Sequence, residues 1–82
     1  MLNVTKVRHV GDHRLWLQFN DGVEGEVDLS DHLDGEIFEA LRDPRFFAEV
    51  RLNPEVRTIA WPNGADLAPE FLRALVPSGA AG

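Results

Sequence analysis

The sequence predicts a small α+β fold: a single domain in which an antiparallel β-meander of about three N-terminal strands and a short second hairpin pack with two or three short helices. Three observations support this prediction. Apolar and polar side chains alternate over the first 29 residues, as in strands with one buried face. From Glu36 the apolar residues follow helical spacing instead. The chain of 82 residues is long enough for one hydrophobic core and no more.

The loop Asn20-Asp21-Gly22 decides the register in which the second and third strands pair. With three residues in the loop, Leu15 lies opposite Val27, and the apolar side chains of both strands share one face. A two-residue loop would set Leu15 opposite Asp28 and divide the apolar side chains between the two faces. We therefore expect the three-residue loop, with Gly22 in the left-handed position of a β-bulge.

The other face of this sheet is polar, and its charges are sorted by strand. In the three-residue register Arg14 lies opposite Asp28, which predicts a cross-strand ion pair, and Trp16 lies opposite Glu26.

The first strand joins this sheet across Gly11-Asp12-His13. An odd loop length there puts Val7 and Thr5 on the apolar face. The polar face then brings together Lys6, Arg8, Trp16 and Gln18.

Short helices follow the meander. Residues 29–33 suit one helical turn capped by Ser30 and ended by Gly35. A helix from Glu36 stops at Asp43-Pro44, where the aspartate caps the next helix and the proline takes its first position. The apolar residues expected to pack these helices on one face of the sheet are Ile37, Phe38, Leu41, Phe46, Phe47 and Val50.

The last third of the chain contains a second hairpin and a final helix. Residues 50–52 and 57–61 suit two short strands, and residues 67–76 suit a helix. The domain is therefore expected to span residues 1–76, followed by a flexible tail at 77–82.

The run WPNGADLAPE, residues 61–70, is the densest group of unusual residues. We expect Trp61 to be a buried anchor with its indole N–H bonded, and Asn63 and Gly64 to fill tight turn positions. Asp66 is placed to cap the next helix. The alternative is a recognition loop in which exposed Asn63 and Asp66 contact a partner.

Charge is unevenly distributed along the chain, whose net charge is −6. Basic residues Lys6, Arg8 and Arg14 come early, and the segment from Asp21 to Glu39 contains acidic residues without a single Lys or Arg. An acidic surface repels phosphate backbones, so direct nucleic-acid binding is disfavoured and a basic protein partner is expected. The candidate interaction residues are Arg8, Arg14, Trp16, Trp61, Asn63, Gly64 and Asp66.

Signs of catalysis or cofactor binding are missing from the sequence. The three histidines, His9, His13 and His32, lack the spacing of a zinc site, and there is no cysteine. We therefore predict no catalytic residue, no metal and no cofactor. The absence of cysteine suits a reducing cytoplasm, and no apolar run is long enough to span a membrane.

Two segments, FNDGVEGEVDLSDHL and FEALRDPRFFAEVRLNPEVRTIAWPNGADLAPEFL, resemble in their order a family of small bacterial proteins catalogued as domain of unknown function 2442. The resemblance covers about residues 3–75 and is most specific at Trp61 to Leu67. Arg57 stands where the family favours glycine. The resemblance implies an α+β domain without an established activity, beside another small protein in an arrangement similar to a toxin–antitoxin pair.

These observations favour a non-enzymatic protein-interaction module, the acidic partner of a basic protein. The alternative is a small-ligand or metal-binding domain, or an enzyme whose site the sequence does not reveal. A nucleic-acid-associated regulator ranks below both. Self-association remains open.

Overall fold

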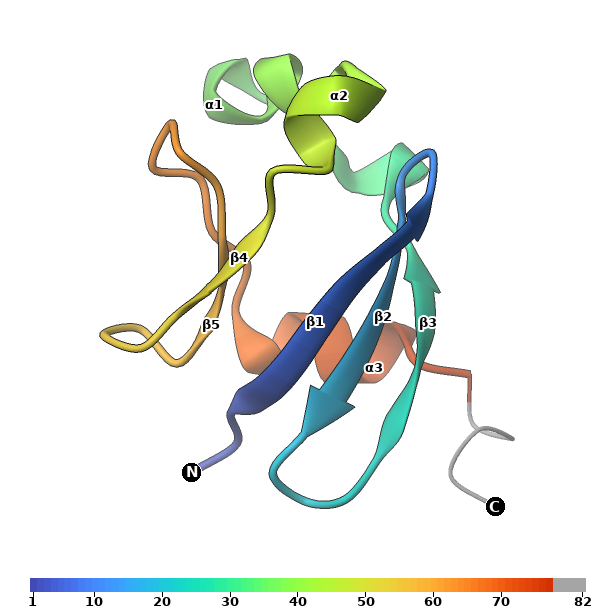
Figure 1. Cartoon of the computed structure of the whole chain (residues 1–82), viewed down its shortest axis with the longest axis vertical. Coiled ribbons are helices and arrows are strands. Elements are labelled where there is room, and N and C mark those ends of the chain that lie inside the picture. The colour runs from blue at the N-terminus through green and yellow to red at the C-terminus, as the bar shows by residue number, and fades with distance from the viewer. Residues whose placement is uncertain (78–82) are drawn as a thin grey trace.

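The computed structural model describes residues 1–77, so residues 78–82 of the expected tail lie outside it. Three strands form the N-terminal sheet in the order β1-β2-β3: β1 is Val4–Gly11, β2 is Arg14–Phe19 and β3 is Glu24–Asp28 (Figure 1). This is the expected antiparallel meander, and with the second hairpin and the short helices it confirms the α+β class.

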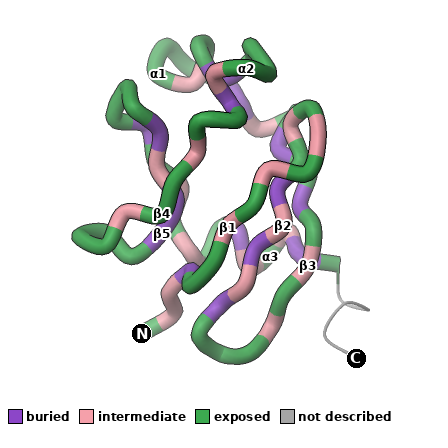
Figure 2. The backbone as a smooth tube through the Cα atoms, in the orientation of Figure 1, coloured by how far each residue is buried: buried purple, intermediate pink, exposed green. Residues whose placement is uncertain are grey.

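The hairpin formed by β2 and β3 has the expected register. Leu15 pairs with Val27, and the Phe19 N–H donates to the Val23 carbonyl at 2.8 Å, which leaves three residues in the loop. Gly22 has a φ of 88° and so takes the left-handed position. The apolar set therefore faces the core, and Leu15 and Leu17 are fully buried (Figure 2).

The predicted pairing of β1 with β2 is confirmed for the two basic residues of β1, whereas the predicted position of Thr5 is wrong. Lys6 pairs with Gln18 and Arg8 with Trp16, as expected. A register shift between Val4 and Lys6 turns Thr5 out to solvent, where its hydroxyl donates to the Gln18 carbonyl at 3.1 Å. Val4 is buried in its place, because the bulge moves the more apolar neighbour onto the core face.

Four short helical segments follow β3: the 3-10 turns η1 (Ser30–His32) and η2 (Ala40–Arg42), and the helices α1 (Glu36–Glu39) and α2 (Pro44–Phe47). Asp43 caps α2 as expected, since its carboxylate accepts from the Arg45 N–H at 3.0 Å. The expected cap at Ser30 is wrong, because Asp28 accepts the N–H of Ser30 itself at 2.9 Å. Gly35, with a φ of 95°, precedes α1.

The second hairpin pairs β4 (Arg51–Asn53) with β5 (Thr58–Ala60), and α3 (Pro69–Leu75) follows. α3 lies behind the N-terminal sheet in Figure 1, whereas α1 and α2 lie at one end of the molecule. The expectation that the two middle helices cover the sheet is therefore wrong. They are single turns that close the end of the core, with Phe47 reaching inward.

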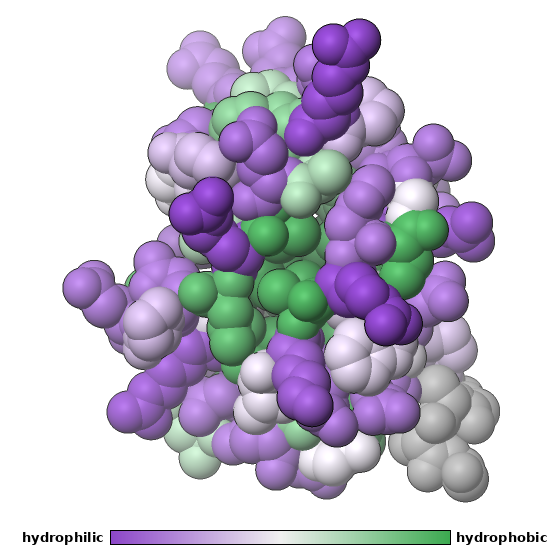
Figure 3. Space-filling view, in the orientation of Figure 1, coloured by the Kyte–Doolittle hydropathy of each residue, from purple (hydrophilic) through white to green (hydrophobic). Residues whose placement is uncertain are grey.

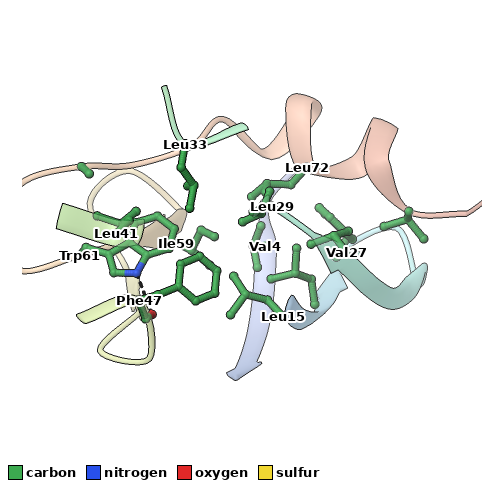
Figure 4. Close-up of a cluster of buried hydrophobic side chains, with 14 residues drawn as sticks. Val4, Leu15, Val27, Leu29, Leu33, Leu41, Phe47, Ile59, Trp61 and Leu72 are labelled. Atoms are coloured by element: carbon green, nitrogen blue, oxygen red, sulfur yellow. Dashed lines mark hydrogen bonds between the residues drawn. The ribbon is translucent and has the colours of Figure 1, made fainter. Parts of the chain in front are cut away.

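One hydrophobic core joins both sheets and α3 (Figure 4). Phe47, Ile59 and Leu72 are fully buried although they come from three different elements. Within residues 1–77, no helix is long and apolar enough to cross a membrane.

Arg57, at the turn of the second hairpin, has a left-handed backbone with a φ of 56°. This conformation costs a residue with a Cβ about 1 kcal/mol of conformational free energy, whereas glycine adopts it freely. Arg57→Gly is therefore expected to raise the free energy of unfolding by about 0.5–1 kcal/mol in urea titrations. In the neighbouring strand, Arg51→Gly should instead lower it, and a loss of stability in Arg57→Gly would contradict the account of this turn.

Candidate interaction site

The corner from Trp61 to Asp66 connects β5 to α3 and is held mainly by Trp61. Its side chain is 3% exposed, and the indole N–H donates to the Phe47 carbonyl at 2.9 Å (Figure 4). Its backbone N–H donates to the Ala65 carbonyl at 2.9 Å, and its carbonyl accepts from the Gly64 N–H at 3.0 Å. Trp61 is thus the buried anchor expected from the sequence.

Asn63 and Gly64 shape the exposed tip of the corner. The Asn63 amide donates to the Ile37 carbonyl at 2.8 Å, and its side-chain oxygen accepts from the Ala65 N–H at 3.1 Å. Gly64 has a φ of 89°, which glycine adopts without strain. Asn63 therefore bonds the corner to α1, and both residues have structural roles.

Asp66 does not cap α3, contrary to expectation. The helix begins three residues later, at Pro69, and its N-cap residue Ala68 makes no side-chain bond. The Leu67 carbonyl accepts from the Thr58 hydroxyl at 2.6 Å, which keeps this segment extended beside β5 until the proline presets the helix. Asp66 is exposed, and its backbone forms an isolated bridge with Ala60.

Asn63→Ala is therefore expected to destabilise the domain more than Asp66→Ala. The first loses two hydrogen bonds and should cost about 1–2 kcal/mol. The second removes an exposed carboxylate and should change the free energy of unfolding by less than about 0.5 kcal/mol. Thermal unfolding of the two variants compares them directly, and an equal loss in both would show that Asp66 has a structural bond after all.

The solvent-facing side of the N-terminal sheet is the second candidate surface. We call it the charge-sorted face. The Arg8 guanidinium lies 5.3 Å from the centre of the Trp16 ring, and Glu26 pairs with Trp16 on the other side. The face consists of Lys6 and Arg8 on β1, Arg14, Trp16 and Gln18 on β2, and Glu24, Glu26 and Asp28 on β3.

Arg14 and Asp28 lie opposite each other as expected, but they do not form the expected ion pair. The Asp28 carboxylate accepts from the Ser30 N–H at 2.9 Å instead. A backbone donor two residues away fixes the carboxylate at less entropic cost than a long arginine side chain. The Ser30 bonds, with the charges of Arg14 and His13 nearby, hold the pKa of Asp28 below its usual value.

The contact between Asp21 and Arg73 was not predicted from the sequence. The Arg73 guanidinium donates to the Asp21 carboxylate at 3.1 Å and so joins α3 to the loop between β2 and β3. The Val23 N–H also donates to this carboxylate, and this bond, followed by Arg73, keeps the pKa of Asp21 below its ordinary value of 3.8. The two residues are 52 positions apart, so spacing could not reveal the pair.

Two aspartates with lowered pKa values make stability depend on pH. A carboxylate with a lowered pKa in the folded state stabilises the fold above its ordinary pKa of 3.8, and this contribution is lost as the pH falls below that value. The free energy of unfolding is expected to drop between about pH 5 and pH 2. Urea titrations should show a smaller drop in Asp28→Ala, and a wild-type value independent of pH would contradict this.

The surface formed by residues 1–77 includes two open hollows. One of about 580 Å³ is beside the second hairpin and is walled by Trp61, Leu52 and Pro54 with the charged Arg51 and Glu49. Figure 3 shows apolar residues exposed in the middle of the face that it draws. A smaller hollow of about 290 Å³ lies at the end of the charge-sorted face.

The histidines do not assemble into a metal site. The His13 imidazole is within hydrogen-bonding distance of the Leu41 and Arg42 carbonyls, at 3.0 and 2.9 Å, and the His32 ring packs edge-on against Phe71. Among residues 1–77, no three His, Cys, Asp or Glu side chains are placed to share a metal ion.

Comparison with known proteins supports the resemblance noted in the sequence. The model of a family described as "Protein of unknown function (DUF2442)" matches residues 4–78. Among solved structures, the chain is similar to a protein of Nitrosomonas europaea described as a "putative DNA binding protein", with a TM-score of 0.81 and 22% identity. The similarity covers 98% of this chain and 52% of the other, so this chain spans about half of that protein's length. No curated protein matches.

Proposed function

Because the chain belongs to the DUF2442 family, whose function is unknown, we propose its function from its surface: the domain is a non-enzymatic protein-interaction module that binds a basic partner through the charge-sorted face and the acidic residues that follow it. The observation that carries the proposal is the separation of charge across one uncovered sheet face, from basic β1 through Trp16 to acidic β3.

The acidic side of this face is extended by the segment after β3. Glu24, Glu26 and Asp28 are all exposed, and exposed Asp31, Asp34, Glu36 and Glu39 follow them in the chain. Opposite charges speed encounter and fix orientation, and a half-buried aromatic ring supplies contact area. Trp16 is such a ring, held between Arg8 and Glu26. The face thus combines a charged surround with an aromatic centre.

The corner is less suited to this role, because its main side chains already serve the fold. Trp61 is buried, Asn63 is bonded to two backbone groups, and Gly64 provides a turn. Only Asp66 remains exposed without a side-chain bond to the described residues.

The test is the salt dependence of partner capture. The immobilised domain is incubated with lysate of its source cells at about 50 mM and about 500 mM salt. We expect a basic protein to be retained at low salt and released at high salt, because screening weakens contacts between exposed charges. Retention that is unchanged at high salt would point to an apolar interface and would overturn the proposed surface.

We also propose a biological setting, which rests on the family resemblance and is compatible with this surface. An acidic domain that covers a basic protein has the form of the neutralising member of a toxin–antitoxin-like pair, and its lack of cysteine suits the cytoplasm. Expressing the captured basic protein with and without the domain tests this. Growth arrest only in the absence of the domain supports an antitoxin-like role, and equal growth contradicts it.

Nucleic-acid association is the second candidate function. It is favoured by the description of the structural neighbour as a "putative DNA binding protein" and by the exposed Lys6 and Arg8 beside Trp16. The net charge of −6 and the adjacent acidic strand oppose it. Fluorescence anisotropy with labelled duplex DNA decides between nucleic-acid association and binding of a basic protein partner. We expect no binding at about 150 mM salt, and binding that is lost in Lys6→Glu would favour this second candidate.

A further inference from the structure

β3 is an outer strand of the N-terminal sheet, with β2 on one side only (Figure 1). In an antiparallel pair, residues with both backbone groups bonded across the pair alternate with residues whose groups point away. The bonds from the Phe19 N–H to the Val23 carbonyl and from the Leu29 N–H to the His13 carbonyl fix this alternation at the two ends of the pair. Residues 25 and 27 therefore bond to β2.

The backbone groups of Glu24, Glu26 and Asp28 consequently face outward. Within residues 1–77, no backbone or side-chain group bonds to their N–H or carbonyl groups. Three consecutive outward positions form a strand edge that another extended chain can pair with.

The opposite edge of this sheet is formed by β1 and is partly occupied. β1 lies beside the second hairpin, and the Val4 N–H donates to the Arg57 carbonyl at 3.1 Å. The second hairpin thus occupies part of the β1 edge, whereas β3 has no neighbour on its outer side among the described residues.

Charge decides what can pair with β3. The three residues with outward backbone groups are all acidic, and their side chains lie on the charge-sorted face. A second copy of β3 would bring like charges together across the new pair, which is destabilising. A segment with lysine or arginine at alternate positions would instead place a cation beside each carboxylate, and apolar residues in between would lie on the face where Val27 is buried.

We propose that β3 is a docking edge to which a basic partner adds an extended segment, alternating basic and apolar residues, as a fourth strand of the sheet. This inference rests on the proposed function and specifies how the partner binds. The open backbone groups give affinity, and the alternating acidic side chains select the sequence.

The test uses a synthetic heptapeptide in which lysine and valine alternate, with a control peptide of the same composition in which the lysines precede the valines. Amide hydrogen exchange is followed by NMR in the complete domain. With the alternating peptide we expect exchange at Glu24, Glu26 and Asp28 to slow by about tenfold, and with the control peptide much less. Binding of either peptide without slower exchange at these amides overturns strand addition, whereas the salt test above still decides the proposed function.

Two substitutions of Glu26 separate the contribution of backbone hydrogen bonds to peptide binding from the contribution of charge. Glu26→Gln and Glu26→Pro both remove the carboxylate, but only proline also removes the outward N–H, a position that edge strands tolerate. We expect the alternating peptide to bind about two- to fivefold more weakly to Glu26→Gln and at least about tenfold more weakly to Glu26→Pro. Equal weakening in two folded variants overturns the proposal. If circular dichroism shows Glu26→Pro to be unfolded, amide exchange in the wild type decides alone.

Discussion

Trp61→Ala is expected to lower the free energy of unfolding by about 3–5 kcal/mol. The ring is 3% exposed, its centre lies 5.5 Å from that of Phe47, and its N–H bond to the Phe47 carbonyl would be lost. The substitution leaves a cavity where β5, α2 and the corner meet. At about 4–8 °C per kcal/mol in a domain of this size, the melting temperature should fall by more than about 12 °C. Such a loss is a large share of the stability of a small domain.

The matched control is the second tryptophan of the chain. Trp16 is half-buried on the charge-sorted face, where the Arg8 guanidinium lies over its ring. Trp16→Ala should cost about 1 kcal/mol or less, so thermal unfolding by circular dichroism should separate the two variants clearly. A comparable loss in both would mean that Trp16 supports the fold and would remove it from the interaction surface.

The second large effect is expected on binding. Replacing Glu24 and Glu26 together with lysine should weaken binding of the captured basic partner by about 10- to 100-fold at low salt. The two side chains lie on the exposed side of β3, so the double variant should melt close to the wild-type temperature. Isothermal calorimetry at about 50 mM and 500 mM salt should show the difference shrinking as screening increases.

Net charge alone could produce part of that effect, and a second double variant controls for it. Replacing Glu49 and Glu55 with lysine changes the net charge equally, but these exposed residues line the hollow beside the second hairpin. We expect less than about a threefold change in affinity. Equal weakening by both double variants would show that the partner senses overall charge and not the charge-sorted face.

The strand register was predictable because two independent constraints agree. Alternation requires Leu15 and Val27 on one face, and the loop that achieves this has a glycine at the position with a φ of 88°. The neighbours on the polar face then follow from parity, including Arg8 beside Trp16. Such local patterns specify most of the meander.

Two predictions are wrong because one side-chain acceptor has several possible donors. The Asp28 carboxylate accepts from the Ser30 N–H, so the serine is not the cap and Arg14 does not form the expected ion pair with Asp28. The same bond to the residue two positions later recurs at Asp21, Asp43, Asn53 and Asn63. Sequence shows that such residues favour turns, but which donor each one takes depends on the local backbone.

The remaining features were not predicted because they depend on how distant elements pack together. The bulge at Thr5 arises because Val4 is the better core residue. The two middle helices do not cover the sheet, because α3 lies behind it (Figure 1) with Leu72 fully buried in the core. The contact between Asp21 and Arg73 joins elements that only the complete fold brings together. For the candidate site, the sequence offered residues of both the corner and the sheet face, but it could not show that the Trp61 and Asn63 side chains are bonded within the fold.

Hydrogen–deuterium exchange of the domain, alone and with the captured partner, tests the central claim most directly. The claim is that the partner binds the charge-sorted face and the acidic edge of β3, whereas the corner maintains the fold. The account predicts that the partner slows exchange in residues 14–18 and 24–28 and leaves residues 61–66 unchanged. Slower exchange confined to residues 61–66, with no change along β2 and β3, would contradict it.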